Sequence, residues 1–429
     1  MVIASIDVQN GRVVQLRQGA DLVLERDNPE ELAREFDRYG EVAVIDLDAA
    51  MGKPGNLELI GPLLRLADCR VGGGIRSPEQ ARELVSLGAR KIIIGSGAFR
   101  NPAGGFGLNL PFLEALAGAV GRERIVVAAD AKMNAAGNYE IVVDGWKTPT
   151  GLDLLSGAAA AAPHVSELLF TCVDREGTMA GIDMEIARRL REAVPCGVTV
   201  AGGVSSLEEV EALAALGCDV QLGMALYTGK VDLAAAFTAS LNWKKAGGER
   251  PLLPVIAQSA GGQVLMTGFT DREALAESFK RRNLCFYSRS REKLWMKGET
   301  SGNTLALLRM RADCDRDAIL AVVEPAGPAC HTGAWSCFET ERRYTWEFLQ
   351  DIITERLRNP APGSYTATLD DELVREKILE EAGELCAAGA RKEVIWEAAD
   401  LLYFATVLLS RAGVTVGEVL NELDRRHKK

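Results

Sequence analysis

An internal repeat in the first half of the chain constrains the fold more than any other feature. The stretch "VGGGIRSPEQARELVSLGARKIIIGSGAF" (71–99) aligns with "VAGGVSSLEEVEALAALGCDVQLGMALY" (200–227) with one gap, and "IASIDV" matches "VAADAK", which places Asp7 opposite Asp130. Each long copy passes from a short apolar run through helical spacing into a second apolar run. The repeat therefore predicts two similar halves built from strand–helix pairs.

Short apolar runs continue this alternation from residue 1 to about residue 241 and predict eight buried strands. They are "VIASIDV", "EVAVIDL", "DCRVGGG", "RKIIIGS", "RIVVAAD", "ELLFTCV", "GVTVAGG" and "DVQLGMA". Strands that alternate with helices form parallel sheets, and eight repeats of this length favour a closed barrel. We therefore predict the α/β class, with an N-terminal (β/α)8 TIM barrel over residues 1–241.

The remainder of the chain changes in character twice. The segment "NWKKAGGERP" (242–251) is polar, contains glycine and ends in proline, which is typical of a linker. Hairpin-like and strand-like runs over 252–340 predict a small α+β metal-binding domain. Long amphipathic patterns over 341–429 predict a C-terminal all-α domain.

Composition limits the partners and the compartment. The formal net charge is −11 and no cluster of Lys or Arg compensates it, which argues against nucleic acid as a partner. Small anionic substrates remain compatible, because backbone amides and metals hold phosphate on acidic proteins. No apolar run is long enough to span a bilayer. Nine cysteines without a disulfide framework predict a reducing, cytoplasmic location.

Glycines at the predicted strand ends indicate phosphate binding, since they let backbone amides approach an oxyanion at a helix start. Two symmetric sets predict a ligand with a phosphate at each end, although such glycines also simply permit tight turns. Asp7 and Asp130 end the first and fifth strands and suit general acid–base chemistry, although either alone could cap a helix. The predicted phosphate-binding residues are Gly73, Gly74, Gly95, Ser96, Gly202, Gly203, Gly223 and Met224.

The predicted barrel contains the motifs "SIDVQNGRVVQLRQG", "VGGGIRS", "DGWKTPTGLD", "TCVDREGT" and "VAGGVSS". Through these motifs it resembles the phosphoribosylformimino-AICAR-phosphate isomerases of histidine biosynthesis. The resemblance implies an Amadori rearrangement (ProFAR to PRFAR) of a bisphosphorylated aminoaldose, with Asp7 as general base, Asp130 as general acid and Thr171 at the third catalytic position. Glu176 stands where the family usually has aspartate.

Two relatives of this barrel remain as alternatives. The cyclase subunit of imidazole glycerol phosphate synthase shares both aspartates, but "RQG" and "DGWKTPTG" fit the isomerase better and no glutaminase is visible in this chain. The barrel could also isomerise phosphoribosylanthranilate.

Metal-seeking side chains concentrate in "RADCDRDAI" (311–319) and "CHTGAWSCF" (330–338). The cysteines of these stretches can give three thiolates to zinc and leave a fourth position open. The aspartates alternate in a strand-like stretch, so their side chains can share a face and bind magnesium. The alternative is an acidic turn beside buried cysteines. The predicted ligands are Cys314, Cys330 and Cys337 for zinc, and Asp313, Asp315 and Asp317 for magnesium.

These stretches, with "SRSREKLWMKGETSG" (288–302), are similar to phosphoribosyl-AMP cyclohydrolase. The resemblance implies that zinc activates the water that opens the adenine ring and that His331 moves the proton. It also implies a dimer in which Cys314 of one chain meets Cys330 and Cys337 of the other. Ala334 and Trp335 replace two arginines common in the family.

Carboxylates spaced three apart mark the last domain. Glu381 and Glu384 form one such pair, and Glu397 and Asp400 form another, so each pair shares one helix face. A solvated face is the alternative, but the second pair interrupts the largely apolar "VIWEAADLLYFATVLL", where charge is costly unless paired or metal-bound. With "GSYTATL" this resembles phosphoribosyl-ATP pyrophosphohydrolase, which implies magnesium at these four residues, with Glu380 as a further candidate.

The three resemblances imply consecutive steps: pyrophosphate release from phosphoribosyl-ATP, ring opening of phosphoribosyl-AMP, and isomerisation of the product. We therefore predict a multifunctional enzyme of histidine biosynthesis that acts on small phosphoribosyl nucleotides. We also predict a homodimer formed through the two C-terminal domains. The alternative of another class is a scaffold whose degenerate domains bind metabolites without turnover, against which the intact site residues speak.

Overall fold

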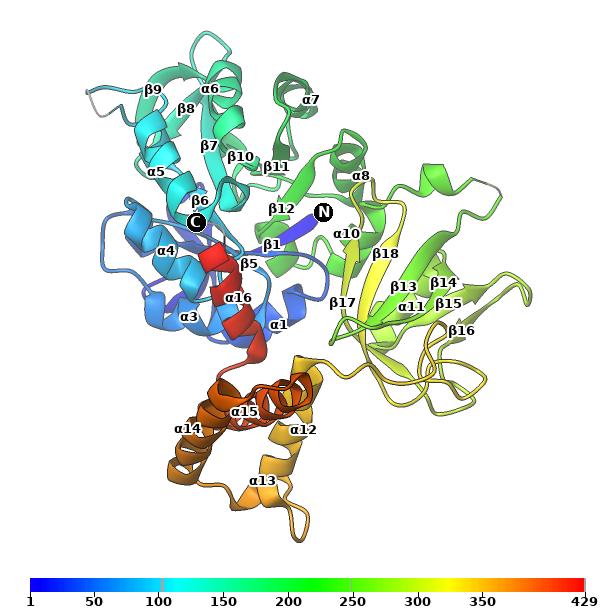
Figure 1. Cartoon of the computed structure of the whole chain (residues 1–429). Coiled ribbons are helices and arrows are strands. Elements are labelled where there is room, and N and C mark those ends of the chain that lie inside the picture. The colour runs from blue at the N-terminus through cyan, green and yellow to red at the C-terminus, as the bar shows by residue number, and fades with distance from the viewer. Residues whose placement is uncertain (102–103, 248, 428–429) are drawn as a thin grey trace. The chain divides into compact units, whose positions relative to one another are not determined.

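The computed structural model describes residues 1–101, 104–247 and 249–427, which form two compact units. The first unit comprises residues 1–260 and 264–340, and the second comprises residues 261–263 and 341–427. Figure 1 shows the chain from its N-terminus in blue to its C-terminus in red. Within the described residues, no helix is both long enough and apolar enough to cross a membrane.

Eight parallel strands close into a barrel within the described part of the first unit (Figure 1). Each strand pairs with its neighbours, and the pairings of β7 with β10 and of β12 with β1 complete the ring. This confirms the predicted (β/α)8 barrel. The strands are β1 (Val2–Gln9), β4 (Val42–Asp46), β5 (Cys69–Gly72), β6 (Lys91–Ile94), β7 (Ile125–Met133), β10 (Glu167–Cys172), β11 (Gly197–Ala201) and β12 (Asp219–Leu222).

The helices between these strands begin where the sequence supplies caps. In the two copies of the repeat, Ser77 accepts from the backbone amide of Gln80, and Ser206 accepts from that of Glu209, so α4 and α8 start alike. The helices are α1 (Pro29–Phe36), α2 (Leu47–Ala50), α3 (Leu57–Leu66), α4 (Pro78–Ser86), α5 (Leu110–Val120), α6 (Leu154–Ala161), α7 (Met184–Ala193), α8 (Leu207–Ala215), α9 (Met224–Tyr227) and α10 (Leu233–Ala239). Short 3-10 turns are η1 (Ser96–Phe99), η2 (Arg122–Arg124), η3 (Ala162–His164), η4 (Val173–Arg175) and η5 (Trp243–Ala246).

Two antiparallel extensions, which the sequence did not predict, follow the two strands that carry the aspartates. The strands β2 (Arg12–Arg17) and β3 (Asp21–Arg26) extend β1, and β8 (Tyr139–Val143) and β9 (Thr148–Asp153) extend β7. The internal repeat thus includes these hairpins.

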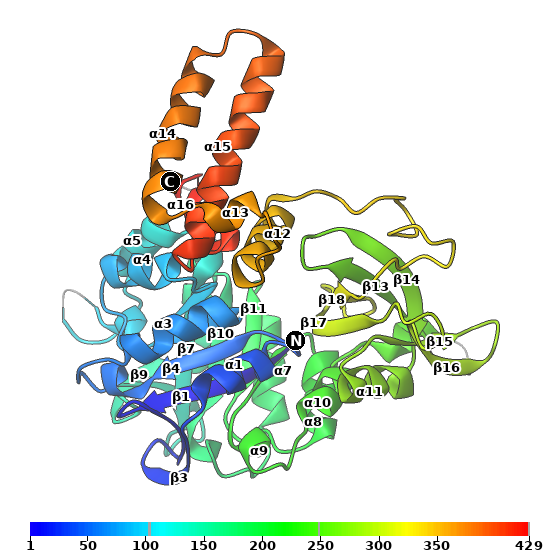
Figure 2. The same ribbon diagram turned by 90° about the horizontal axis from the view of Figure 1, so that it is seen from below.

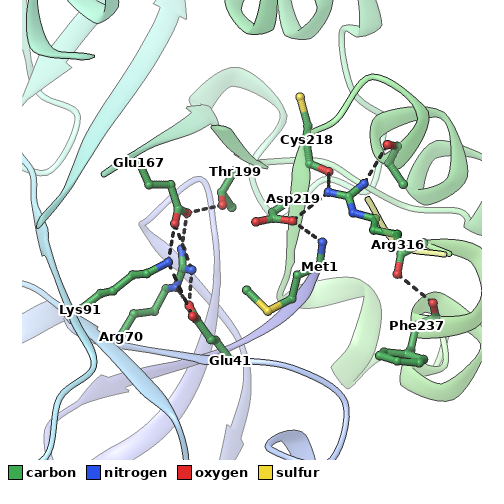
Figure 3. A network of polar contacts seen from close by, with 12 residues as sticks. Met1, Glu41, Arg70, Lys91, Glu167, Thr199, Cys218, Asp219, Phe237 and Arg316 are labelled. Carbon is green, nitrogen blue, oxygen red and sulfur yellow. Dashed lines mark hydrogen bonds and ion pairs between the residues drawn. The ribbon is translucent and has the colours of Figure 1, made fainter. Parts of the chain in front are cut away.

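A buried ion cluster closes the amino-terminal end of the barrel (Figure 3). The guanidinium of Arg70 is fully buried and binds Glu41, with a 2.8 Å contact from its Nε, and also Glu167. Lys91 donates to Glu167 at 2.8 Å. Burial raises the pKa of Glu167, but the charges of Arg70 and Lys91 outweigh it and lower that pKa to about 2. Replacement of one of these charged residues by a neutral one would leave an unpaired buried charge and destabilise this end of the barrel.

The rest of the first unit is a four-stranded sheet in the order β14-β13-β18-β17, with β13 and β18 parallel and the other neighbours antiparallel. A separate hairpin and one helix accompany it. The elements are β13 (Leu253–Ser259), β14 (Val264–Thr270), α11 (Arg272–Arg281), β15 (Cys285–Ser288), β16 (Lys293–Met296), β17 (Leu305–Ala312) and β18 (Ile319–Pro325).

The predicted linker begins as a buried segment rather than as an exposed spacer. Trp243 is 6% exposed and donates from its indole nitrogen to the carbonyl of Thr238 at 2.8 Å. Phe237 and Leu241, which end the barrel, belong to the same hydrophobic cluster as the core of the four-stranded sheet. The barrel and this sheet therefore share apolar packing around residue 243.

The second unit is helical, as predicted. Its core contains Ile353, Leu369, Val374, Phe404 and Val407. Figure 2 shows α14 and α15 lying side by side as an antiparallel pair. The helices are α12 (Trp346–Arg358), α13 (Tyr365–Thr368), α14 (Asp371–Ala387), α15 (Arg391–Arg411) and α16 (Val416–His427).

Candidate functional site

A cavity of about 300 Å³ opens at the carboxyl ends of the barrel strands. The structure brings every barrel residue predicted for the site into its lining. These residues are Asp7, Asp130, Thr171, Gly73, Gly74, Gly95, Ser96, Gly202, Gly203, Gly223 and Met224. Active sites of such barrels occupy this end, so the cavity is the candidate active site.

Asp7 lies near the end of β1 and accepts a hydrogen bond from a residue of the same strand. The hydroxyl of Ser5 donates to its Oδ1 at 2.7 Å. Burial raises the pKa of Asp7 to about 6, and this hydrogen bond opposes the rise. A carboxylate with this pKa is ionised at neutral pH but basic enough to accept a proton from carbon.

Asp130 lies on β7 and has two hydrogen-bonding neighbours. The indole nitrogen of Trp146 donates to its Oδ2 at 2.9 Å. Burial raises the pKa of Asp130, and hydrogen bonds from Thr171 and Trp146 partly offset that rise. Thr171 therefore contacts the second aspartate directly. Trp146 had no predicted role, although it is part of the quoted "DGWKTPTGLD" motif.

Glu176 adds a third carboxyl group to the cavity. Burial raises its pKa to about 8, and the charges of Asp7 and Asp130 add to the effect. At neutral pH this side chain mostly carries a proton. The longer glutamate at this position therefore supplies a neutral carboxylic acid to the cavity that also contains Asp7 and Asp130.

Backbone conformation and close backbone packing account for the glycines after β5 and β11. Gly73 has φ +104°, and an added Cβ would lie 2.1 Å from the carbonyl oxygen of Asp46. Gly202 has φ +87°, and its Cβ would lie 2.6 Å from the carbonyl oxygen of Cys172. Tight turns alone therefore require glycine here. Gly95 differs, because a Cβ there would meet nothing within 4 Å.

The acidic loop, defined as residues 313–317, joins β17 to β18. One carboxylate oxygen from each of Asp313, Asp315 and Asp317 lies within 4.8 Å of the others, close enough to share a metal ion. The ammonium group of Lys245 binds Asp315 and lies 3.2 Å from Asp317. The Lys245 ammonium group thus forms ion pairs with two of the three carboxylates, so their oxygens already face a positive charge.

The cysteines divide into a pair and a separate thiol. Cys330 and Cys337 interact directly with each other. The hydroxyl of Thr332 donates to Cys330 Sγ at 3.1 Å and lowers the pKa of that thiol, whereas burial raises the pKa of Cys337. Among the described residues of one chain, Cys314 does not join them in a group able to hold a metal.

The segment of the cysteine pair includes one predicted site residue and one departure from the family pattern, and a further residue that the prediction missed interacts with both thiols. The Nδ1 of His331 lies 3.9 Å from Cys330 Sγ. Trp335, one of the two departures from the family pattern, packs against the core of the four-stranded sheet. The missed residue is Lys297, whose burial lowers its pKa while the charges of the two cysteines raise it. Its place in "KLWMKGETSG" was the only sequence signal.

In the second unit, α14 and α15 bring three of the four predicted carboxylates together. Oxygens of Glu381, Glu384 and Glu397 lie within 4.8 Å of one another. Burial, followed by the charges of Asp400 and Glu384, raises the pKa of Glu381. Asp400 therefore acts on the group electrostatically, but its oxygens are not among the three clustered ones. The further candidate Glu380 binds Lys377 at 2.6 Å instead.

Comparisons with known proteins follow the same division of the chain. The family described as histidine biosynthesis protein matches residues 1–232, phosphoribosyl-AMP cyclohydrolase matches 266–339, and phosphoribosyl-ATP pyrophosphohydrolase matches 347–427. Proteins named histidine biosynthesis bifunctional protein HisIE are similar to part of the chain. That of Pyrococcus furiosus is 42% identical over 204 residues, which are 44% of this chain and 96% of the relative. Those of Bacillus subtilis and Vibrio cholerae are 41% and 38% identical, over 42% and 45% of this chain and 94% and 97% of the relatives.

Fold and site together define a class: a (β/α)8 barrel with a carboxyl-lined cavity, fused to segments that carry clustered carboxylate and thiol side chains. The chain belongs to the histidine biosynthesis protein family, whose match over residues 1–232 includes all eight barrel strands. With the two following matches it is a multifunctional histidine-biosynthesis protein that contains isomerase-type, cyclohydrolase-type and pyrophosphohydrolase-type segments.

Proposed function

We propose that this chain catalyses three consecutive steps of histidine biosynthesis: it hydrolyses phosphoribosyl-ATP to phosphoribosyl-AMP and pyrophosphate, opens the adenine ring, and isomerises ProFAR to PRFAR. The observation that carries the proposal is the presence of all three families in one chain. Each product is the substrate of another segment. The proposed domains are 1–241, the linker 242–251, 252–340 and 341–429.

In the barrel, Asp130 donates a proton to the furanose ring oxygen of the aminoaldose, and the ring opens to an imine. Asp7 then removes the proton from C2, and the resulting enolamine rearranges to the aminoketose. The pKa of about 6 for Asp7 supports its role as the base. The hydrogen bond from Trp146 supports the placement of Asp130 as the acid. While Asp130 carries the proton that it donates, a protonated Glu176 avoids a second carboxylate charge beside that of Asp7.

The two phosphates of this substrate bind at opposite sides of the cavity. Gly95 and Ser96 begin η1, and Gly223 and Met224 begin α9, at corresponding places in the two repeats. Backbone amides at these starts point to where an oxyanion binds. The open space beside Gly95 supports the phosphate-binding role there.

In the second segment, the acidic loop holds magnesium and the cysteines hold zinc. Three hard carboxylate oxygens suit magnesium, and three thiolates with an open fourth position suit a catalytic zinc. When bound, the zinc lowers the pKa of water so that hydrolysis proceeds at neutral pH. His331, beside Cys330, moves the proton. The direct contact between Cys330 and Cys337, with Cys314 apart, supports a site completed by a second chain.

In the third segment, Glu381, Glu384, Glu397 and Asp400 hold magnesium beside the phosphoanhydride of the substrate. Burial and neighbouring carboxylates raise the pKa values of Glu381 and Glu397. This mutual repulsion supports a cation-binding site, because a bound cation would relieve it. Val394, Ile395 and Trp396 are exposed on α15 at 41%, 54% and 65%. Such an apolar surface supports the proposed homodimer through the two C-terminal domains. We also place the protein in the cytoplasm.

The test is to supply purified full-length protein with phosphoribosyl-ATP and to separate the products. Pyrophosphate, the ring-opened intermediate and the aminoketose should appear in that order. Strong chelation should stop both hydrolytic steps but spare isomerisation, because the proposed barrel machinery contains no metal. Magnesium alone should restore pyrophosphate release, and ring opening should require zinc as well. An isomerase lost on chelation, with the fold intact, would contradict the barrel mechanism.

A further inference from the structure

The acidic loop contains one residue whose side chain leads away from the carboxylates. Arg316 stands between Asp315 and Asp317 with a left-handed backbone, at φ +63°. The loop is closed by Asp313, whose carboxylate accepts from the amides of Asp317 at 3.0 Å and of Ala318 at 3.1 Å. The geometry of the three aspartates therefore depends on how this short turn is held.

The guanidinium of Arg316 is bound by the barrel (Figure 3). It donates to the carbonyl oxygens of Ala214 at 2.7 Å and Cys218 at 2.8 Å, and to the Oδ1 of Asp219 at 2.9 Å. Its side chain is 12% exposed. Ala214 lies in the last turn of α8, where the carbonyl oxygens and the helix dipole favour a cation. This end of the barrel is opposite the cavity.

The backbone of the same loop is held as well. The amide of Asn242 donates to the carbonyl oxygen of Arg316 at 2.7 Å, and its side-chain amide donates to that of Asp315 at 3.4 Å. Asp219 is itself fixed, because it also binds the amino terminus of Met1 (Figure 3). The side chain of Arg316 thus binds the end of the barrel, and its backbone carbonyl binds Asn242 in the segment that follows the barrel.

From these contacts we infer that Arg316 is a positioning residue, through which the amino-terminal end of the barrel fixes the acidic loop for metal binding. The inference rests on the proposed function of Asp313, Asp315 and Asp317 as magnesium ligands. Three carboxylates so close together repel one another, and an unsupported loop would spread them. Fixing the turn beforehand reduces the ordering cost of metal binding, and groups that orient metal ligands typically change affinity by about 10- to 100-fold.

Another interdomain arginine provides a matched control. Arg309, on β17, forms ion pairs with Asp68 at 3.3 Å and Asp37 at 3.6 Å, so it also joins this sheet to the barrel. It lies outside the acidic loop. Replacement of Arg309 by methionine removes an equivalent charge from the interface without touching the loop anchor.

The first measurement is backbone hydrogen exchange in the metal-free, full-length protein. In Arg316→Met, the amides of Asp317 and Ala318 should exchange about tenfold faster, because the turn opens more often. In Arg309→Met they should exchange at the wild-type rate. Asp219→Asn, which changes only the barrel side of the contact, should accelerate the same two amides and provides a second variant should Arg316→Met fail to fold. Unchanged exchange in the folded anchor variants overturns the inference.

The second measurement is the affinity of the loop for Mn²⁺, detected by electron paramagnetic resonance. The full-length background carries Glu384→Gln and Glu397→Gln, which removes the helical carboxylate group, and loss of the signal in Asp315→Asn assigns it to the loop. Arg316→Met should weaken Mn²⁺ binding about tenfold, whereas Arg309→Met should not. Unchanged affinity in Arg316→Met overturns the inference even when exchange is faster. Absence of any loop-bound Mn²⁺ in the background protein instead refutes the proposed magnesium site, and the inference falls with it.

Discussion

The indole nitrogen of Trp146 donates a 2.9 Å hydrogen bond to the Oδ2 of Asp130. Trp146 reaches this carboxylate from the turn between β8 and β9, where its own backbone is left-handed at φ +69°. On the other half of the repeat, Asp7 receives its hydrogen bond from Ser5, a residue of the same strand. The two aspartates are therefore related by the repeat but are tuned by different donors.

Trp146→Phe should separate the roles of the two aspartates. Loss of the indole donor removes an influence that lowers the pKa of Asp130, so that pKa should rise. If Asp130 is the acid, its protonated form then persists to higher pH, and the alkaline limb of the isomerase pH profile moves upward. The rate should also fall by about 10- to 100-fold, the usual effect of one hydrogen bond to a charged group.

Ser5→Ala is the matched control for this experiment. It removes the donor to Asp7 and raises the pKa of the proposed base, so the acidic limb should move to higher pH instead. Isomerase rates of both variants from pH 5 to pH 9 distinguish the two limbs. A shift of the acidic limb in Trp146→Phe would reverse the assignment of acid and base.

Glu176 should make the barrel less stable as pH rises. Its folded pKa of about 8 lies above the ordinary value of 4.5, so the folded state binds an extra proton between these values. The contribution of Glu176 to the free energy of unfolding is therefore fully present below about pH 4.5 and is lost as pH rises through about 8. Asp7 contributes in the same direction up to about pH 6.

Calorimetry of the barrel transition tests this. In Glu176→Gln, the loss of melting temperature between pH 6.5 and pH 9 should be smaller than in the wild type, because no proton leaves a buried site. The exposed Glu58→Gln should behave like the wild type. Parallel wild-type and Glu176→Gln curves would show that Glu176 is ionised in the folded barrel at neutral pH.

The sequence predicted the barrel because its strands are buried on both faces and read as continuous apolar runs. The outer strands of the hairpins escaped prediction for the opposite reason, because β3 and β9 have no buried residues. The inner strands β2 and β8 do contain short buried runs, which the prediction passed over. The contact of Trp146 with Asp130 depends on the path of the hairpin formed by β8 and β9. The sequence motif therefore included Trp146 but did not reveal that it binds Asp130. The Arg316 anchor joins residues 97 positions apart, which no local pattern reveals.

The same difference between local and long-range contacts decided which carboxylate clusters could be predicted. Asp313, Asp315 and Asp317 were predictable together because they lie within one turn. The helical carboxylates required the packing of α14 on α15, and there the structure groups three of the four predicted residues. Helical spacing predicts which side chains share a face, but it does not fix the distance of each to the neighbouring helix.

Asp7→Asn should abolish isomerisation and leave ring opening intact. Asp7 lies in the cavity at the carboxyl end of the barrel, whereas the sheet that carries the acidic loop contacts the opposite end, through residues such as Asp37 and Asp219. Loss of a general base typically costs about 10²- to 10⁴-fold. The two activities are measured on ProFAR and phosphoribosyl-AMP with the same purified protein. Failure of the folded variant to consume phosphoribosyl-AMP would show that the two sites are coupled through the barrel.

The separation of Cys314 from the interacting pair Cys330 and Cys337 predicts complementation between chains. Cys314→Ser and Cys330→Ser proteins, each inactive in ring opening, are dissociated, mixed equally and reassembled. In a twofold mixed dimer, one shared site collects both lesions and the other is intact. Random pairing makes about half of the dimers mixed, so roughly a quarter of wild-type ring opening should return. Cys314→Ser mixed with Cys314→Ser,Cys330→Ser is the control and should recover nothing, because no chain in it supplies an intact Cys314. A zinc site built within one chain would leave every site damaged in either mixture, so absence of recovery despite demonstrated subunit exchange would refute the shared site.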